Sequence, residues 1–420
     1  MRRAARPGPG SALSRLLGDT DPDEFPRVWG RRALLATAQQ RGGDTAADLF
    51  GPAAVDELLS RRALRTPFLR MAKDGATLPE ARFTAGGGTG AGIADQVDPD
   101  KVMRLFDQGA TVVLQALHRS WPPLTDFTAA LAADLGHPVQ VNAYVTPAQN
   151  QGFSPHYDVH DVFVLQVHGR KEWTVHEPVH RAPLRDQPWT DRQQQVGAAA
   201  EGEPALRATL QPGDCLYLPR GFIHSARAEG GTSIHLTFGI HQWTRHHLAE
   251  ELIGLARTRL RETEALRESL PPGTGATGEE TVARELDRVR AALVEAVRAV
   301  PAEDLARVLQ QRDRATARAA PVSPLAQLEA VSGVGPGTRL ELRPHLALAT
   351  GAPESGVVRV RSRAGAFRMP VALAGALDRL LEAGARGRAV TVAQLDPDPE
   401  TARAAAKLFL RAGVAVVPDG

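Results

Sequence analysis

Hydrophobic and polar residues alternate in the middle of the chain, between residues 139 and 241. A period of two is typical of β-strands that bury one face. The alternation is clearest in residues 141–146, 162–167, 171–175, 215–218 and 233–238. Gly and Pro turns separate these segments, and we expect one such turn at residues 168–170, His-Gly-Arg. Short strands joined in this way predict a β-sandwich or barrel.

Helical spacing of apolar residues dominates on both sides of this region. Before it, we expect helices after Asp98 and over residues 124–135. After it, an apolar stripe recurs at steps of three and four residues: Val282, Leu286, Val289, Leu293, Val297 and Val300. Such a stripe must bury against another helix. Residues 271–273, Pro-Pro-Gly, are expected to break this part into an antiparallel helix pair.

These patterns predict a mainly β core with α+β surroundings. We expect a core unit with a helical lead-in over residues 1–242 and a helical connector over residues 243–320. Residues 321–420 mix strand and helix patterns, which favours a small α+β end domain.

Composition supports a folded chain of more than one domain. The 420 residues are 43% hydrophobic and 23% charged, which is typical of globular proteins. No apolar run reaches the roughly 18 residues that a membrane helix needs, so we expect no membrane association. The basic residues 1–8 precede no apolar segment, so we expect a cytoplasmic protein. The single cysteine, Cys215, excludes an internal disulfide framework.

Histidine is concentrated in the β region, where 11 of the 13 histidines lie between residues 137 and 247. His156 and Asp158 are two residues apart, and on a strand both would point to the same face. His224 follows after 65 intervening residues, on a later predicted strand. Two imidazoles and one carboxylate are the ligand set that suits Fe(II) with open positions. A His-x-Asp pair alone is common, and a surface or capping pair is its simpler interpretation.

Lys171 is a second candidate, on the strand that follows the expected turn. A lysine whose ammonium points into a barrel needs an anionic partner, because an unpaired buried cation is costly. A dicarboxylate cosubstrate would supply one. A solvated lysine in a hairpin is the alternative.

Several motifs occur together in a fixed order: residues 142–147, Asn-Ala-Tyr-Val-Thr-Pro; His156-Tyr157-Asp158; residues 162–167; residues 169–173, Gly-Arg-Lys-Glu-Trp; and residues 213–224. In this combination the sequence resembles the JmjC-type cupin oxygenases, and within them the ribosomal oxygenase branch. The resemblance implies a double-stranded β-helix, a jelly-roll or cupin fold, over residues 1–242. It also implies a helical dimerisation region over 243–320, and hence a homodimer, and a winged-helix-like domain over 321–420.

The same resemblance implies roles for individual residues and a requirement for Fe(II), 2-oxoglutarate and O2. His156, Asp158 and His224 match the iron ligands, and Lys171 matches the residue that binds the distal carboxylate of 2-oxoglutarate. Asn142 matches a polar cosubstrate contact, and Tyr144 lies where the family lines its substrate channel. The roles of His235 and Thr237, both on one face of a predicted strand, stay open.

The implied reaction is hydroxylation of an arginine or histidine of a ribosomal protein. Alternatives with the same chemistry are a small molecule, a peptide natural product or a methyl-lysine, although no aromatic cluster for a methylammonium is evident. A non-enzymatic barrel that binds nucleic acid is a third class, but its basic C-terminal residues lack an RNA-stacking motif, so we do not expect direct nucleic-acid binding. Residues 181–208 form an insertion in the β region that would reshape the substrate mouth.

Overall fold

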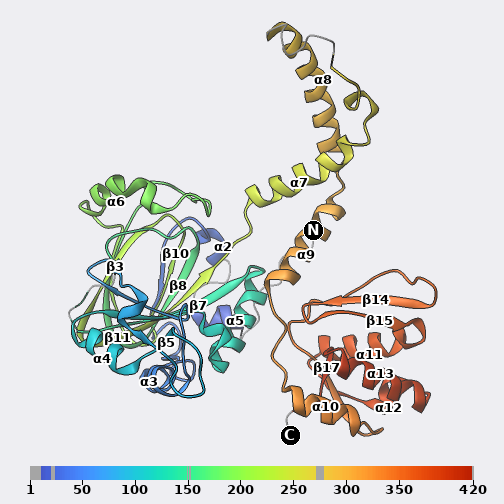
Figure 1. The fold of residues 1–420 in the computed structure, drawn as a ribbon, viewed down its shortest axis with the longest axis horizontal. Coiled ribbons are helices and arrows are strands. Elements are labelled where there is room, and N and C mark those ends of the chain that lie inside the picture. Colours follow the sequence, from blue (N-terminus) through green and yellow to red (C-terminus); the bar gives the residue numbers. More distant parts are fainter. Residues whose placement is uncertain (1–10, 20–23, 149, 151–152, 271–278, 419–420) are drawn as a thin grey trace. The chain divides into compact units, whose positions relative to one another are not determined.

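The structure, a computed structural model, describes residues 11–19, 24–148, 150, 153–270 and 279–418. The chain forms two compact units, Met1–Gln242 and Trp243–Gly420 (Figure 1). Two expectations from the sequence, those drawn from residues 1–8 and from residues 271–273, lie outside the described residues. None of the helices within the described residues is long and apolar enough to cross a membrane.

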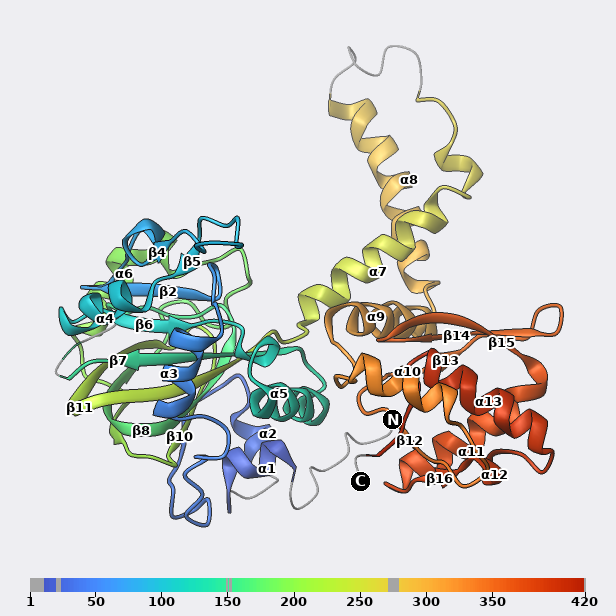
Figure 2. The ribbon, with the colours of Figure 1, turned by 60° about the horizontal axis from the view of Figure 1, so that its bottom comes forward.

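One large antiparallel sheet organises the first unit, as the period-two pattern predicts. Figure 2 shows its strands β2, β6, β7 and β11 side by side. In spatial order the described strands are β1 (Leu34–Ala36), β10 (Cys215–Leu218), β8 (Asp161–His176), β11 (Ile223–Ile240), β7 (Val139–Thr146), β6 (Thr111–Leu114), β2 (Leu69–Lys73) and β3 (Ala76–Thr77), with β9 (Leu206–Leu210) beside β8.

Two long strands, β8 and β11, run through both halves of this sheet. The second half of β11 pairs with β7 and with the first half of β8, whereas its first half pairs with the second half of β8. The prediction of a turn at residues 168–170 is therefore wrong, because β8 continues through these residues. Gly169 explains the continuity: its φ is +63°, and an added Cβ would lie 2.1 Å from the carbonyl oxygen of Thr232. The strand bends there without leaving the sheet.

Replacement of Gly169 by alanine is expected to destabilise the first unit by more than about 2 kcal/mol. The left-handed backbone alone costs an alanine about 1–2 kcal/mol, and the clash with Thr232 adds to it. The measurement is the urea midpoint of unfolding. Gly230→Ala is the matched control, since Gly230 has a φ of +77° but nothing within 4 Å of its Cβ position. Equal losses in both variants would show that the approach of Thr232 is unimportant.

Helices pack against the sheet and share its main hydrophobic core. The helix expected after Asp98 is confirmed, and the Asp98 side chain caps it by accepting from the backbone of Asp100 and Lys101. The helix expected over residues 124–135 is also confirmed. The helices of this unit are α1 (Ala12–Leu17), α2 (Phe25–Val28), α3 (Pro52–Arg61), α4 (Pro99–Asp107), α5 (Pro122–Leu135) and α6 (Gln193–Ala200), with a short ladder of β4 (Thr84–Ala85) and β5 (Gln96–Val97).

Apolar side chains fill both faces of the sheet. The larger cluster lies between sheet and helices and includes Leu124 and Phe238. A smaller one, with Val164, Val175 and Leu216, comes from β8, β10 and the strands beside them. The polar side chains that face a cavity are therefore set in a rigid frame.

The second unit combines helices with short strands around its own core, which includes Leu340, Leu377 and Phe409. Its helices are α7 (Arg245–Leu260), α8 (Glu279–Arg298), α9 (Ala302–Thr316), α10 (Pro324–Ser332), α11 (Ala374–Ala385), α12 (Val392–Leu395) and α13 (Pro399–Arg411). Its strands are β12 (Arg339–Leu342), β16 (Val390–Thr391) and β17 (Ala415–Val416) in one sheet, and β13 (Ala349–Thr350), β14 (Val357–Ser362) and β15 (Gly365–Pro370) in another.

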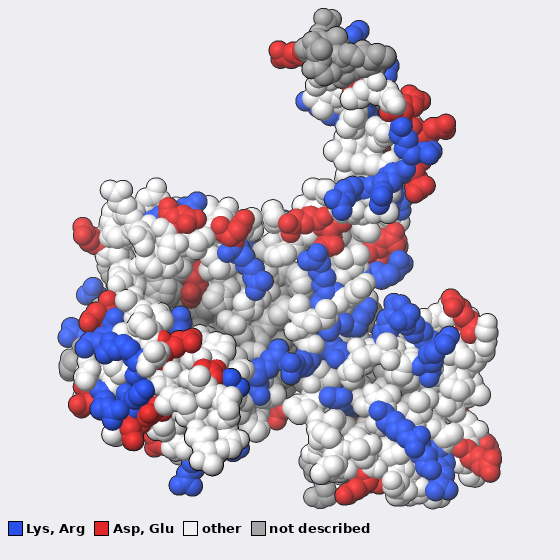
Figure 3. All heavy atoms as spheres, in the orientation of Figure 1, with Lys and Arg blue, Asp and Glu red and all other residues white. Residues whose placement is uncertain are grey.

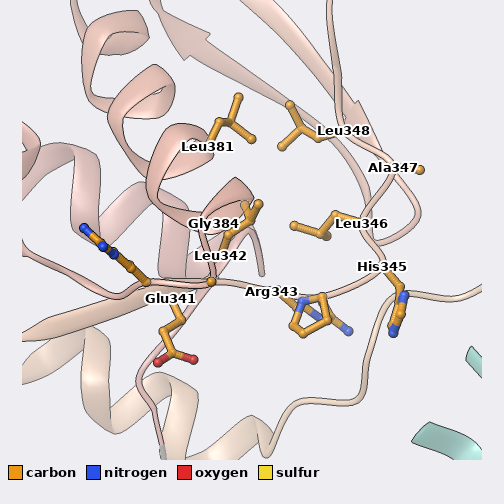
Figure 4. A pocket seen from close by; sticks show the side chains of 12 residues that line it. Glu341, Leu342, Arg343, His345, Leu346, Ala347, Leu348, Leu381 and Gly384 are labelled. Carbon is orange, nitrogen blue, oxygen red and sulfur yellow. The ribbon is translucent and has the colours of Figure 1, made fainter. Parts of the chain in front are cut away.

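A cavity of about 550 Å³ lies in this second unit, between the segment after β12 and the end of α11. Figure 4 shows Leu346, Leu348 and Leu381 pointing toward a common space. The guanidinium of Arg343 donates to the carbonyls of Ala320 and Gly413. Two of its nitrogens thus bond within the fold, and the described lining is mainly apolar.

Candidate metal centre and cavity

His156 and His224 are held opposite each other by their backbones. The His156 amide donates to the His224 carbonyl at 3.2 Å, and the His224 amide donates back at 2.8 Å. His224 lies at the start of β11, whereas His156 forms only this isolated bridge. The prediction that a strand carries His156 and Asp158 is therefore wrong. Pro155 has no amide hydrogen, so it cannot continue a ladder of backbone hydrogen bonds.

The side chains of His156, Asp158 and His224 nevertheless converge. One nitrogen or oxygen atom of each lies within 4.8 Å of the others, and the described residues contain no other such group. Nε2 of His224 is 3.8 Å from Oδ2 of Asp158, and the two imidazole centroids are 4.5 Å apart. The backbone amide of Gly221 donates to the carbonyl of Asp158, which fixes the loop that carries it.

Both imidazoles are oriented by backbone carbonyls. Nδ1 of His156 lies 2.7 Å from the Ser154 oxygen, and Nδ1 of His224 lies 3.0 Å from the Phe222 oxygen. A proton on each Nδ1 leaves the Nε2 lone pair free, which is the arrangement that metal-binding histidines use.

Electrostatics favour the ligand forms of His224 and Asp158 at neutral pH. Burial, followed by the nearby His156, lowers the pKa of His224 to about 4. Burial alone would raise the pKa of Asp158, but the charges of His160, His224, His156 and Arg70 outweigh it and lower that pKa. A neutral imidazole and an ionised carboxylate can both donate electron pairs to a cation.

Lys171 is a buried cation on β8, with 3% of its surface exposed. Its ammonium donates to Oγ1 of Thr146 at 2.9 Å, and it has no ion pair with any described carboxylate. Burial lowers the pKa of Lys171 to about 7. The interior thus holds an ammonium whose charge lacks a counterion, and a ligand carboxylate would supply one.

The structure places Tyr144 on the cavity wall and Asn142 beside it. The amide oxygen of Asn142 accepts from the backbone of Ala116 at 2.9 Å. The Tyr144 ring stacks on His235, with centroids 4.9 Å apart and planes 2° apart. Asn142 is not among the residues that line the cavity.

These side chains surround a cavity of about 250 Å³. Its wall also contains residues that the sequence did not single out: Arg70, Thr111, Phe153, Val162, Val164, Trp173, Trp189, Ser225 and Ala226. Trp189 comes from the 181–208 insertion, which therefore contributes to the site. His235 and Thr237, whose roles stayed open, line the cavity as well. Four aromatic rings stand on this wall, so the expectation of no aromatic cluster is wrong.

The site defines a class of protein. A large antiparallel sheet that surrounds a cavity with two histidines and one aspartate is a JmjC/cupin-type fold, and the donor set fits Fe(II). Residues 123–248 match the family model for the JmjC domain.

Curated relatives narrow the class. The chain is 32% identical over 274 residues to human "Ribosomal oxygenase 1", across 64% of this chain and 40% of the human protein. It is 38% identical over 136 residues to "Bifunctional lysine-specific demethylase and histidyl-hydroxylase NO66" of Drosophila persimilis, across 32% of this chain and 19% of the fly protein. The chain thus spans less than half of these relatives. The resemblance to JmjC-type ribosomal oxygenases is confirmed.

Solved structures agree on the fold. The ribosomal oxygenase YcfD of Escherichia coli has a TM-score of 0.53 at 19% identity, covering 94% of this chain and 98% of that one. A YcfD structure with cobalt and succinic acid has a TM-score of 0.52 at 18% identity, covering 95% and 99%. At this identity the likeness establishes shared architecture along nearly the whole chain.

Proposed function

We propose that this chain is an Fe(II)- and 2-oxoglutarate-dependent oxygenase that hydroxylates an arginine or histidine side chain of a ribosomal protein. The observation that carries the proposal is the cluster of His156, Asp158 and His224 in one cavity with the unpaired ammonium of Lys171. The names of the curated relatives support the ribosomal target. Such a target agrees with the expected cytoplasmic location.

Each residue has a separate task in this proposal. His156, Asp158 and His224 would hold Fe(II), and Lys171 would pair with the distal carboxylate of 2-oxoglutarate. Thr146 orients the Lys171 ammonium. When bound, Fe(II), 2-oxoglutarate and O2 supply the oxidation of a C–H bond, with release of CO2 and succinate.

The test is succinate formation by the purified chain with Fe(II), 2-oxoglutarate, ascorbate and ribosomal proteins from a strain that lacks the gene. We expect succinate together with a +16 Da shift in one ribosomal protein. Succinate without any shifted ribosomal protein, but with a modified small molecule or peptide, would move the target to those alternatives. No succinate under any condition would contradict the enzyme class.

We also propose roles for the parts of the second unit, with residues 243–320 as a dimerisation region and 321–420 as a winged-helix-like domain. The hairpin of β14 and β15 beside α11 and α13 supports the second assignment. For the first, α8 leaves its apolar stripe exposed within one chain: Val282 is 50%, Leu286 40%, Val289 44% and Leu293 39% accessible. Figure 3 shows an uncharged area on this helix next to charged side chains.

A homodimer is therefore expected at micromolar concentration, since exposed apolar stripes of this kind bury against a partner helix. Leu286→Glu combined with Leu293→Glu should convert the dimer of about 90 kDa into a monomer, given a chain mass of 44.9 kDa. Light scattering measures this. Arg288→Glu, at an exposed arginine on the opposite face of the helix, is the control. A wild-type monomer would contradict the proposal.

A further inference from the structure

Tyr157 stands between two of the proposed metal ligands in the chain, but its side chain does not line their cavity. It is 1% exposed, and no step of the proposed chemistry uses it. Its ring packs in a separate small cluster with Ile223, the residue before His224, and with Val196. Val196 is the buried residue of α6. The cluster therefore joins both ligand-bearing segments to the insertion of residues 181–208.

The Tyr157 hydroxyl fixes the backbone of this insertion. It donates to the carbonyl oxygen of Gln187 at 3.0 Å. Gln187 closes a turn there, because its Oε1 accepts from the Leu184 amide at 2.9 Å and its own amide donates to the Leu184 carbonyl at 3.0 Å. Two residues further on, Trp189 lines the cavity, with its ring centroid 6.2 Å from that of His156. The residue next to His156 in the chain thus holds the segment whose ring stands beside the His156 imidazole.

A second contact ties the insertion to the loop before His224. The amide of Gly221 donates to the Asp158 carbonyl at 3.0 Å. An added Cβ at Gly221, which has a φ of +88°, would lie 2.5 Å from the carbonyl oxygen of His180 and 2.9 Å from Cδ of Pro183. Only glycine allows this approach of the two backbones. The start of the insertion is thus packed against a loop that also holds the backbone of a proposed metal ligand.

We propose that Tyr157 is a positioning residue that holds Trp189 against the metal centre and so makes residues 181–208 a fixed wall of the site, formed before any target binds. This deepens the proposed function and rests on it, because the wall has a task only if the metal cluster is the reaction centre. A lid that closes only over bound target needs a loosely packed contact with the core, whereas Tyr157 and Val196 are each 1% exposed.

Hydrogen exchange of residues 184–200 tests the anchoring. Tyr157→Phe keeps the ring and removes only the hydroxyl, so the protected amides of this segment should exchange about two- to tenfold faster, which corresponds to the loss of one hydrogen bond. Tyr217→Phe is the matched control, because it removes a buried tyrosine hydroxyl that donates to Asp161, outside the insertion. It should leave these amides unchanged. Equal exchange in Tyr157→Phe and wild type would overturn the inference.

The second measurement follows Trp189 itself. The chain is labelled with 5-fluorotryptophan, and its 19F spectrum with Co(II), whose paramagnetism shifts the signals of nearby nuclei, is compared with that with Zn(II). Trp189→Phe assigns the signal. In Tyr157→Phe combined with Val196→Ala, the Co(II)-induced shift of Trp189 should fall by about half or more, because the cavity and the lost hydrogen bond together release the insertion. The shift of Trp173, whose ring centroid is 5.9 Å from that of His224, should match wild type.

The outcomes separate this inference from the proposed function. An unchanged Trp189 shift, even with faster exchange, would leave Tyr157 a merely structural residue and overturn the inference. A wild-type chain that bound no Co(II) would overturn the metal centre and the inference together. Neither measurement uses turnover, so a chain that gave both expected results but formed no succinate would contradict the proposed function alone.

Discussion

Replacement of Asp158 by alanine should reduce succinate formation at least a hundredfold. The carboxylate is the one anionic donor among three groups that lie within 4.8 Å of one another. Without it, two neutral imidazoles must hold a dication alone, which costs more than the roughly 10–100-fold loss seen when only supporting contacts are changed. His156→Ala should reduce succinate formation to the same extent. Two readouts are needed, succinate by NMR and bound Co(II) by its visible absorption.

The matched control is His168→Ala, since His168 is an exposed histidine on β8 that takes no part in the cluster. It should bind Co(II) and form succinate as wild type does. If His156→Ala and Asp158→Ala also turned over normally, the ligand assignment would be wrong. Loss of succinate formation with normal Co(II) binding would instead mean that these residues act in a step after metal binding.

Metal binding should also weaken in acid. The pKa of His224 is lowered to about 4, so its imidazole is neutral and available at pH 7. Protons compete for Nε2 only as the pH falls toward that value.

The sequence predicted the strands of the site well because a sheet with one buried face imposes a strict period of two. Residues 141–146 and 215–218 correspond to β7 and β10. The sequence pattern gave a wrong prediction at Gly169. A glycine usually marks a turn, but this one lets a strand bend where Thr232 approaches closely. A sequence pattern cannot show which tertiary contact a glycine accommodates.

The three proposed metal ligands could be predicted from the sequence because they lie in two short motifs. Arg70, Phe153 and Trp189 were not, because a β-strand, a loop and a 3-10 turn far apart in the chain bring them together. The one local sign of Arg70 was a charged residue between the apolar, buried Leu69 and Met71. A charge within a strand that is otherwise buried indicates a polar cavity on that face.

Lys171→Met should weaken 2-oxoglutarate binding roughly 10- to 150-fold, since hydrogen bonds to charged groups contribute about 1.5–3 kcal/mol. Binding should also depend on pH. The pKa of Lys171 in the empty cavity is about 7, because burial disfavours the ammonium, whereas a bound carboxylate favours it. Above pH 7 the free lysine has lost its proton and must recover it to pair. The affinity should therefore fall about tenfold per pH unit between pH 8 and 9.

Calorimetry of the Mn(II)-loaded chain, in two buffers of different ionisation enthalpy, measures both the affinity and the proton taken up. At pH 8 wild type should take up close to one proton for each 2-oxoglutarate bound. Lys171→Arg keeps a permanent charge and should bind without proton uptake, and Lys171→Met should show neither the affinity nor the uptake. Lys73→Met, at a lysine on β2 outside the cavity lining, is the control and should match wild type. Equal affinity in Lys171→Met and wild type would mean that another group holds the distal carboxylate, even if the metal cluster were correctly assigned.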